Sequence, residues 1–443
     1  MIVKSLTMIS WELDPFHTRG GTAYAIRRLA NQLTGLGIET RVLLPDWLDS
    51  LPGKDLAPLF KPMLLKMRSE LRQAPRGVQC SEFCRAAVEA VAQIKARTEV
   101  DAVIAHSDEC AMFTILRGVQ RSDEPSVFCL HSLYDPPTSD FSSAQRQLLP
   151  SPSLLASAVM MADIVVTSSG VLQDAQEFEW PDRLRELQQA LVNASAEHRL
   201  LTVESTGCLP GIPNSQDKAI DDTNLESLSN LPSPYVLFPS RPSADKGFGI
   251  FAAIAERLRA DKITCVAVQR PALRSRSGSP SRDASVYWLP WLAQNELRSA
   301  MRKAACTVFP SLTEGFGLAA GESISQGVPT LYQQVGGHHR LQSLPNALTV
   351  PLTTSERARL YSLWAELIDK HVDPWSIWAR YEVSLRPLID KWVEAVRSVM
   401  RREAGRIENP YFPQRPVEER WGNRIRHRIE AGEQEKRGQR SEV

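Results

Sequence analysis

Residues 307–337 read TVFPSLTEGFGLAAGESISQGVPTLYQQVGG and form the most informative stretch of the chain. The apolar run at 307–309 predicts a short buried strand, which Pro310 ends. Helical sequence follows a glycine-rich loop and extends over residues 318–326, until the Gly-Val-Pro turn at 327–329 breaks it. The stretch therefore predicts a strand, a loop and a helix in succession.

Two glutamates in this stretch are candidate binding groups, Glu314 on the expected loop and Glu322 on the expected helix. A carboxylate accepts hydrogen bonds from neighbouring hydroxyl groups, so each glutamate can hold a diol, one on a hexose and one on a ribose. Gly315, Gly317 and Gly321 leave backbone N–H groups at the helix start free to meet a phosphate between the two sugars. The alternative is a surface helix with two solvated glutamates, the commoner state of this residue.

The stretch resembles the donor-site motif of retaining glycosyltransferases with the GT-B fold, in particular the family-4 type, in which two Glu residues bracket a Gly-Phe-Gly sequence. The residues at 335–337, Val-Gly-Gly, add to the similarity. The resemblance implies an enzyme that transfers a hexose from a nucleotide diphosphate sugar to an acceptor hydroxyl with retention of configuration. The acceptor would be a glycan, a glycolipid or a small molecule. The roles it implies are sugar-hydroxyl binding by Glu314, ribose binding by Glu322, and backbone amides lent by Phe316, Gly317 and Leu318.

The segment PSRPSADKG at residues 239–247 is a second match, and it follows the first predicted strand of the second half. Arg241 and Lys246 in this segment resemble the Arg and Lys with which the family clamps the donor diphosphate. Two cations that face a pyrophosphate neutralise the charge that grows as the sugar leaves. The alternative is an ordinary surface Arg and Lys.

Two glycines in the first half, Gly20 and Gly21, resemble the turn whose backbone amides touch the donor phosphate. Their context, SWELDPFHTRGG at residues 10–21, is similar to glycogen and starch synthases. That family carries Lys two residues before its first Gly, whereas this chain has Thr18 there and Arg19 beside it. A plain turn at the start of a helix is the alternative.

Two histidines follow apolar strands in the first half. His131, in SVFCLHSLYD, resembles the family histidine that approaches the transferring sugar near its 6-hydroxyl. A histidine at the carboxyl end of a strand is well placed to hydrogen-bond a substrate. His106, in DAVIAHSDE, is a similar candidate on the acceptor side. The alternative for each is a structural histidine that is satisfied within the core.

The composition is that of an ordinary globular protein of two or three domains, with 443 residues and a formal net charge of +1. A charge this small gives no field that would select nucleic acid or a membrane. The seven cysteines form no Cys-x-x-Cys pair, and their odd number argues against a disulfide framework and favours a reducing cytosol. The chain has no Asp-x-Asp triplet, so we expect no metal ion and no cofactor other than the nucleotide sugar as co-substrate.

The order of predicted elements gives an α/β fold with two Rossmann-like doubly wound domains that face a cleft, as in GT-B. We expect strands near residues 2–9, 40–44, 101–105, 126–130 and 164–167, then near 235–239, 263–268, 286–289 and 307–309. The expected organisation is an acceptor-side domain at 1–206, a linker at 207–234, a donor domain at 235–375, a helix at 376–400 that crosses back to the first domain, and a charged tail at 401–443.

Charges of both signs dominate the tail, and this composition predicts disorder. Val417, Trp421, Ile425 and Ile429 recur every fourth residue, so the alternative is an inducible helix on an anionic membrane or partner. The N-terminal MIVKSLTMIS has too short an apolar run for a secretory signal, and no apolar window is long enough to span a bilayer. We expect a cytoplasmic protein, with peripheral contact at the inner face of the membrane as the alternative.

Two departures from the family pattern support a rival interpretation, a non-catalytic GT-B scaffold or regulator whose cleft has drifted. The family's Pro-Asn-Gly-Val-Asp stretch at the hinge is replaced by LPGIPN at residues 209–214. The residues at 269–271, Gln-Arg-Pro, stand where the family has a Gly-rich turn near the nucleotide base. A nucleotide-sugar epimerase on the same fold is a third interpretation.

Overall fold

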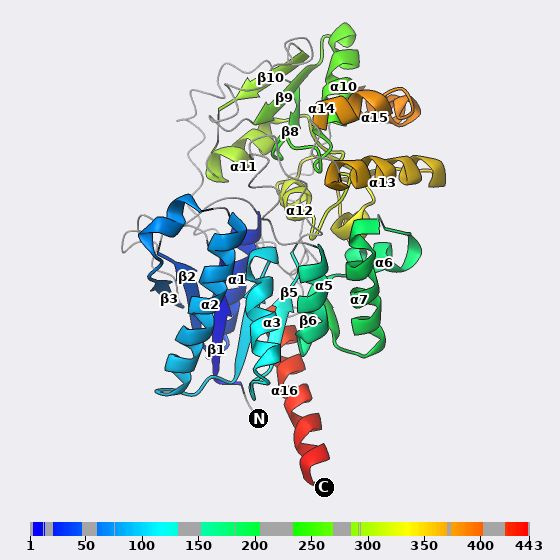
Figure 1. The fold of residues 1–443 in the computed structure, drawn as a ribbon. Helices are drawn as coiled ribbons and strands as arrows, with labels where there is room; N and C mark the ends of the chain where they lie inside the picture. The colour runs from blue at the N-terminus through cyan, green and yellow to red at the C-terminus, as the bar shows by residue number, and fades with distance from the viewer. Residues whose placement is uncertain are drawn as a thin grey trace. The chain divides into compact units, whose positions relative to one another are not determined.

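The structure is a computed structural model, and it describes residues 3–11, 13, 21–46, 60–74, 76–131, 152–180, 182–203, 234–268, 285–290, 292, 294–369, 374–401 and 421–441. The chain divides into two compact units (Figure 1). The first unit comprises Met1–Tyr134, Phe141–Cys208 and Arg415–Val443, and the second comprises Asp135–Asp140 and Leu209–Gln414. The expected linker at 207–234 lies outside the described residues except for its last one.

The first unit is built on a seven-stranded sheet with the strand order β3-β2-β1-β4-β5-β6-β7. All of its strand pairs are parallel. The strands are β1 (Ser5–Ile9), β2 (Glu39–Pro45), β3 (Lys61–Leu65), β4 (Ala102–His106), β5 (Ser126–Cys129), β6 (Ile164–Ser168) and β7 (Leu200–Val203). The helices are α1 (Gly21–Gly35), α2 (Arg76–Lys95), α3 (Ala111–Val119), α5 (Pro152–Met161), α6 (Ser169–Glu177) and α7 (Arg185–Ala196). The strand order reverses between β1 and β4, which marks the switch point where ligands bind in open α/β sheets.

The second unit repeats this architecture around a six-stranded parallel sheet with the order β10-β9-β8-β11-β12-β13. Its strands are β8 (Tyr235–Phe238), β9 (Thr264–Val268), β10 (Val286–Leu289), β11 (Cys306–Phe309), β12 (Thr330–Gln333) and β13 (Ala347–Val350). Its helices are α10 (Phe248–Leu258), α11 (Gln294–Lys303), α12 (Leu318–Ser325), α13 (Thr354–Asp369), α14 (Pro374–Tyr381) and α15 (Arg386–Arg401). Here the switch point lies between β8 and β11.

The predicted fold class, two Rossmann-like parallel-sheet domains, is confirmed. The expected strands recur within a few residues of their predicted ends because they are short, continuous apolar runs that become buried on both faces. Four strands were not predicted: β12 and β13 of the second sheet, and β3 and β7, which are the two edge strands of the first sheet. Of these two edge strands, β3 is mostly exposed and β7 is mostly partly buried, so neither has the buried apolar character of a central strand.

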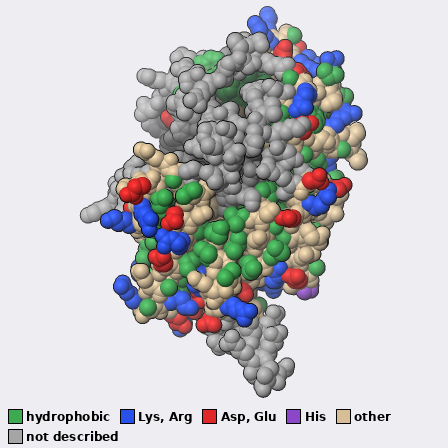
Figure 2. Space-filling view, viewed as in Figure 1, with side chains coloured by type: hydrophobic (Ala, Val, Ile, Leu, Met, Phe, Trp, Pro, Cys, Tyr) green, Lys and Arg blue, Asp and Glu red, His purple; other side chains and the backbone are tan. Residues whose placement is uncertain are grey.

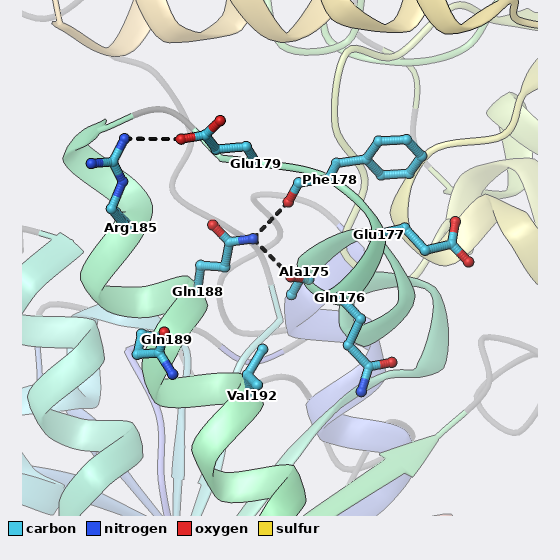
Figure 3. A pocket seen from close by; sticks show the side chains of 9 residues that line it. All are labelled: Ala175, Gln176, Glu177, Phe178, Glu179, Arg185, Gln188, Gln189 and Val192. Carbon is cyan, nitrogen blue, oxygen red and sulfur yellow. Dashed lines mark hydrogen bonds and ion pairs between the residues drawn. The ribbon is translucent and has the colours of Figure 1, made fainter.

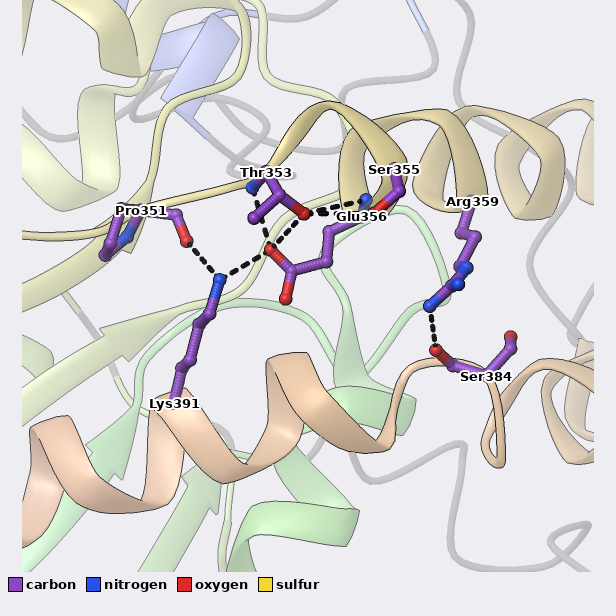
Figure 4. A network of polar contacts seen from close by, with 7 residues as sticks. All are labelled: Pro351, Thr353, Ser355, Glu356, Arg359, Ser384 and Lys391. Atoms are coloured by element: carbon purple, nitrogen blue, oxygen red, sulfur yellow. Dashed lines mark hydrogen bonds and ion pairs between the residues drawn. The ribbon is translucent and has the colours of Figure 1, made fainter.

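Helix α13 begins with a capping box, and the same residues also hold α15 (Figure 4). The Glu356 carboxylate accepts hydrogen bonds from the backbone N–H and the hydroxyl of Thr353, at 2.8 and 2.9 Å. Lys391 of α15 donates to the same carboxylate oxygen at 2.7 Å. This contact fastens α15 to the start of α13, and Arg257 of α10 pairs with Asp390 of α15.

The returning helix differs from the expected one. Residues 376–400 were expected to form a helix that crosses back to the first domain, but α15, which covers most of this range, packs on α10 within the second unit. The segment that joins the first unit is α16 (Trp421–Ser441), which lies in the tail that the composition predicts to be disordered. Ile425 and Ile429 explain the difference, because both are buried, and α16 packs against α1.

The burial of α16 also bears on the suggested membrane helix. The apolar positions Ile425 and Ile429 are already covered by the first unit, so they do not form a free apolar face. Figure 2 shows hydrophobic side chains gathered instead on the face of the first unit that carries α3 and α5. Val119, Met160 and Met161 are exposed there. None of the helices in the described ranges is long and apolar enough to cross a membrane.

Candidate functional site

Two loops meet at the switch point of the second sheet, one after β8 and one after β11. Each loop ends in a glycine with left-handed backbone geometry that precedes a helix, Gly247 (φ 72°) before α10 and Gly317 (φ 65°) before α12. A side chain at Gly247 would overlap the carbonyl oxygen of Pro310, and the N–H of Leu312 donates to the carbonyl of Asp245 at 2.8 Å. The two loops are therefore in backbone contact, and the N-termini of two helices start at the same edge of the sheet.

Two of the predicted residues come together on these loops. The Lys246 ammonium lies 3.2 Å from a carboxylate oxygen of Glu314 and 3.6 Å from one of Asp245. The side chains of Lys246 and Glu314 are 19% and 16% exposed, so the pair remains reachable from solvent. Arg241 lies on the same loop as Lys246 and is half-buried. The sequence thus identified a charged cluster at the carboxyl edge of β8 and β11.

The Val-Gly-Gly residues at 335–337 support the Glu314 loop from behind. A side chain at Gly336, whose φ is 47°, would overlap the carbonyl oxygen of Glu314. A side chain at Gly337 would overlap the backbone of Phe316, and the Gly337 N–H donates to the Glu314 carbonyl at 2.9 Å. Only glycine allows two backbones to approach this closely, so the pattern noticed in the sequence is a backbone support for the loop that carries Glu314.

The residue after this glycine pair, His338, is a functional candidate that the sequence analysis missed. Its ring is fully buried, with 0% exposure, and its Nε2 lies 4.0 Å from a carboxylate oxygen of Glu314. Its Nδ1 lies 3.2 Å from the carbonyl oxygen of Gln333. Burial lowers the pKa of His338, while the negative charge of Glu314 opposes that shift. Its position directly after the Gly-Gly pair was the available signal.

The predicted ribose ligand, Glu322, is engaged by another side chain. Arg298 of α11 donates from Nε to a Glu322 carboxylate oxygen at 2.7 Å. One helical turn further, Arg302 donates to the side-chain oxygen of Gln326 at 2.9 Å, so two parallel contacts join α11 to α12. Phe316 is buried and Leu318 begins α12, whose first-turn N–H groups have no acceptor within their own helix.

The first unit contains the remaining predicted residues. His131 follows β5 and His106 ends β4, and Nδ1 of His106 lies 3.0 Å from Nε2 of His131. Burial lowers the pKa of His131 to about 4, and burial together with His131 lowers the pKa of His106 well below its ordinary value. Both rings are therefore neutral at pH 7, with one N–H between them. Gly21 begins α1, and Gly20 lies outside the described residues.

A separate hollow of about 510 Å³ lies between α6 and α7 (Figure 3). The Gln188 amide donates to the carbonyls of Ala175 and Phe178 at 2.7 and 2.6 Å and so fixes the turn between the helices. Arg185 and Glu179 pair at 3.2 Å on its rim. None of the predicted residues lines this hollow. We therefore place the candidate site at the β8–β11 switch point.

Across the described part of the chain, no group of at least three His, Cys, Asp or Glu side chains is arranged to hold a metal ion. Six described cysteines are free and buried. Burial raises the pKa of Cys84 and of Cys265 to about 12. These thiols are therefore protonated at neutral pH and unsuited to nucleophilic chemistry.

Residues 233–358 match the family model described as "Glycosyl transferases group 1". The protein named uncharacterized glycosyltransferase YqgM from Bacillus subtilis (strain 168) is 26% identical over 168 residues. This match covers 32% of the present chain and 46% of that relative, so it spans about half of the relative's length. The matched residues lie in the second unit and include the loops of Lys246, Glu314 and His338.

Solved structures share this fold over about 90% of the chain. The catalytic domain of starch synthase IV from Arabidopsis thaliana, bound to ADP and acarbose, aligns with a TM-score of 0.61 and 15% identity. The alignment covers 90% of this chain and all 100% of that one. Sucrose-phosphate synthase from Thermosynechococcus elongatus aligns with a TM-score of 0.53 and 18% identity, over 89% of this chain and 94% of that one. At these identities the likeness confirms the fold, two Rossmann-like domains of the GT-B type.

Proposed function

We propose that the protein is a retaining glycosyltransferase that moves a hexose from a nucleotide diphosphate sugar to an acceptor hydroxyl. The observation that carries the proposal is the Lys246–Glu314 pair, set where two helices begin at the switch point of a glycosyltransferase group 1 domain. A helix N-terminus favours an anion through its N–H groups and its dipole. A carboxylate beside it suits the hydroxyl groups of a sugar.

The cations have a role at the diphosphate. In the proposed complex, Lys246 and Arg241 face the donor phosphates, and the N-termini of α10 and α12 add backbone N–H groups. Negative charge accumulates on the leaving diphosphate as the sugar–oxygen bond breaks, so these contacts strengthen toward the transition state. Such electrostatic stabilisation would do the work that a bound divalent ion does elsewhere, and we therefore propose metal-independent transfer.

The carboxylates have roles at the two sugars. Glu314 would accept hydrogen bonds from the transferring hexose once Lys246 turns toward the diphosphate. Glu322 would accept from the ribose, and its contact with Arg298 fixes the orientation of the carboxylate. Phe316, Gly317 and Leu318 would contribute backbone amides at the start of α12.

In the proposed reaction, the configuration of the anomeric carbon is retained because the acceptor oxygen attacks this carbon on the same face from which the diphosphate leaves. The bond between the anomeric carbon and the phosphate oxygen breaks, the acceptor oxygen bonds to the same carbon, and its proton passes to the departing phosphate. No protein nucleophile takes part, so the chain supplies position and charge. His131, neutral and fixed by His106, would hydrogen-bond the transferring sugar near its 6-hydroxyl.

The partners proposed are a nucleotide-sugar donor and a glycan, glycolipid or small-molecule acceptor, in the cytoplasm. The second candidate function is a non-catalytic scaffold with a GT-B fold. One observation favours it: the two carboxylates expected to bind the donor are each engaged by a cation of the chain, Glu314 by Lys246 and Glu322 by Arg298.

Donor binding separates the two functions. We would measure thermal unfolding with a panel of UDP-, ADP- and GDP-hexoses, and a donor at a hundred times its dissociation constant should stabilise the fold by about 2.7 kcal/mol. The enzyme should also hydrolyse that donor slowly without acceptor. Arg259→Ala, at the far end of α10 from Gly247, is the matched control and should keep the shift that Lys246→Ala loses. Absence of both binding and hydrolysis across the panel would leave the scaffold as the better conclusion.

A further inference from the structure

His338 is held behind the Glu314 loop with little freedom to move. A side chain at Gly317 would approach the His338 ring carbon Cδ2 to 2.6 Å, so the loop can pass over the ring only as glycine. Phe309 and Tyr332 contact the ring edge-on, with centroids 6.2 and 5.5 Å away. The ring plane is therefore fixed by packing from β11, β12 and the loop itself.

The hydrogen bond at Nδ1 determines where the proton of the neutral ring lies. A carbonyl oxygen only accepts, so the 3.2 Å contact with the Gln333 carbonyl requires the proton on Nδ1. In the neutral ring Nε2 is then an acceptor. It is buried and has no hydrogen-bond partner in the part of the chain that the structure describes.

The unpartnered nitrogen faces Glu314. Nε2 lies 4.0 Å from the same carboxylate oxygen that Lys246 contacts at 3.2 Å. Two acceptors cannot hydrogen-bond each other, so the neutral ring makes no bond to the carboxylate. A proton on Nε2 would convert the ring into a cationic donor directed at Glu314, which is the stronger kind of hydrogen bond.

We propose that His338 is a positioning residue for Glu314: the neutral ring leaves the carboxylate available to the hydroxyl groups of the donor sugar, and the protonated ring captures it. This inference rests on the proposed function, in which Glu314 binds the transferring hexose. In this proposal His338 does not contact the substrate and influences its binding only through Glu314.

The groups around the ring determine whether the pKa of His338 is raised or lowered. Burial lowers the pKa of His338, Glu314 on the loop after β11 raises it, and Lys246 on the loop after β8 and His339 on its own segment lower it. The Tyr332 hydroxyl on β12 accepts from Thr349, and burial raises its pKa, so it stays neutral across this range. The ring is thus neutral at pH 7 and gains its proton only below the ordinary histidine value of about 6.5.

The first test reads the ring itself and does not depend on any activity. Histidine ring signals are followed by NMR from pH 4 to 8, and the His338 signal is assigned by its loss in His338→Asn. In Glu314→Gln the titration midpoint of His338 should move to lower pH, because the variant removes the charge that favours the protonated ring. An unchanged midpoint would overturn the inference, whether or not the protein transfers sugar.

The second test uses a matched pair of variants in the transfer assay. His338→Asn keeps a donor near the Gln333 carbonyl but nothing at the Nε2 position, so it should keep activity at pH 7 and lose the acid limb of kcat/KM. His338→Gln places an N–H toward Glu314 at every pH and should lower kcat/KM at pH 7 by roughly tenfold. His339→Asn, the neighbouring histidine, should retain the acid limb. An acid limb unchanged in His338→Asn would refute the inference, whereas absence of any transfer in the parent would count against the proposed function alone.

Discussion

The His106–His131 pair makes the stability of the first unit depend on pH in a calculable way. Burial lowers the pKa of His131 from the ordinary histidine value of 6.5 to about 4, whereas the unfolded chain binds its proton near 6.5. Between these values the unfolded state binds more protons than the folded state. Stability should therefore be full above pH 6.5 and decrease as pH falls toward 4.

The size of the effect follows from the same shift. One pKa unit corresponds to about 1.36 kcal/mol, so the full interval gives about 3 kcal/mol at pH 4, of which about 2 kcal/mol is already lost at pH 5. Replacing His131 with Asn removes this contribution. The variant will be less stable at pH 7 because it loses the contact with His106, but its stability should change less between pH 6.5 and 5.

The assay must report on the first unit alone, because a chain of two units need not unfold in one step. Amide hydrogen exchange of β4 and β5, measured by mass spectrometry from pH 5 to 7.5 and corrected for intrinsic rates, does so. His427→Asn is the control, since His427 is exposed on α16 and its removal should leave the parent profile unchanged. If His131→Asn lost protection between pH 6.5 and 5 in parallel with the parent, the assignment of the pH dependence to this pair would be refuted.

Three further predictions concern the second unit and α16. Glu314→Gln should lower turnover by about a hundredfold with a smaller effect on donor binding, and a loss within about threefold would contradict its role at the sugar. Lys246→Ala and Arg241→Ala should each weaken donor binding and turnover while EDTA changes neither, and a loss in EDTA that magnesium restores would overturn metal-independent transfer. Gly336→Ala should reduce the yield of folded protein, because its side chain would overlap the Glu314 carbonyl, whereas Gly35→Ala meets nothing within 4 Å and should be neutral or slightly stabilising.

The contact between Lys246 and Glu314 was predictable although 68 positions separate them. In a parallel sheet every carboxyl end lies at one edge, so residues that follow adjacent strands meet there. The sequence marks both strands by apolar runs and both loops by glycine before a helix. Gly247 and Gly317 precede α10 and α12, a local feature, and the sheet then supplies the long-range contact.

The returning helix shows where local rules are insufficient. The composition of residues 401–443 predicts disorder because charge dominates it, and the isoleucines of α16 suggest an apolar stripe without saying what covers it. The cover is α1, where the Gly422 N–H donates to the side-chain oxygen of Gln32 across 390 positions of sequence. The sequence of α1 or of α16 alone does not predict that the two helices pack together. An amphipathic stripe indicates that one face of a helix is buried, but it does not indicate which element covers that face.

His338 was missed for a related reason. It belongs to no periodic pattern, and its one local signal, the glycine pair before it, does not indicate that the ring is buried. Its significance arises from Gly317, 21 positions earlier, whose missing side chain admits the ring beneath Glu314. Gly317, which the sequence offers as a phosphate-binding feature, is thus also what allows a buried histidine to face the carboxylate. A substitution at Gly317 should therefore change the titration midpoint of His338 as well as the shape of the loop.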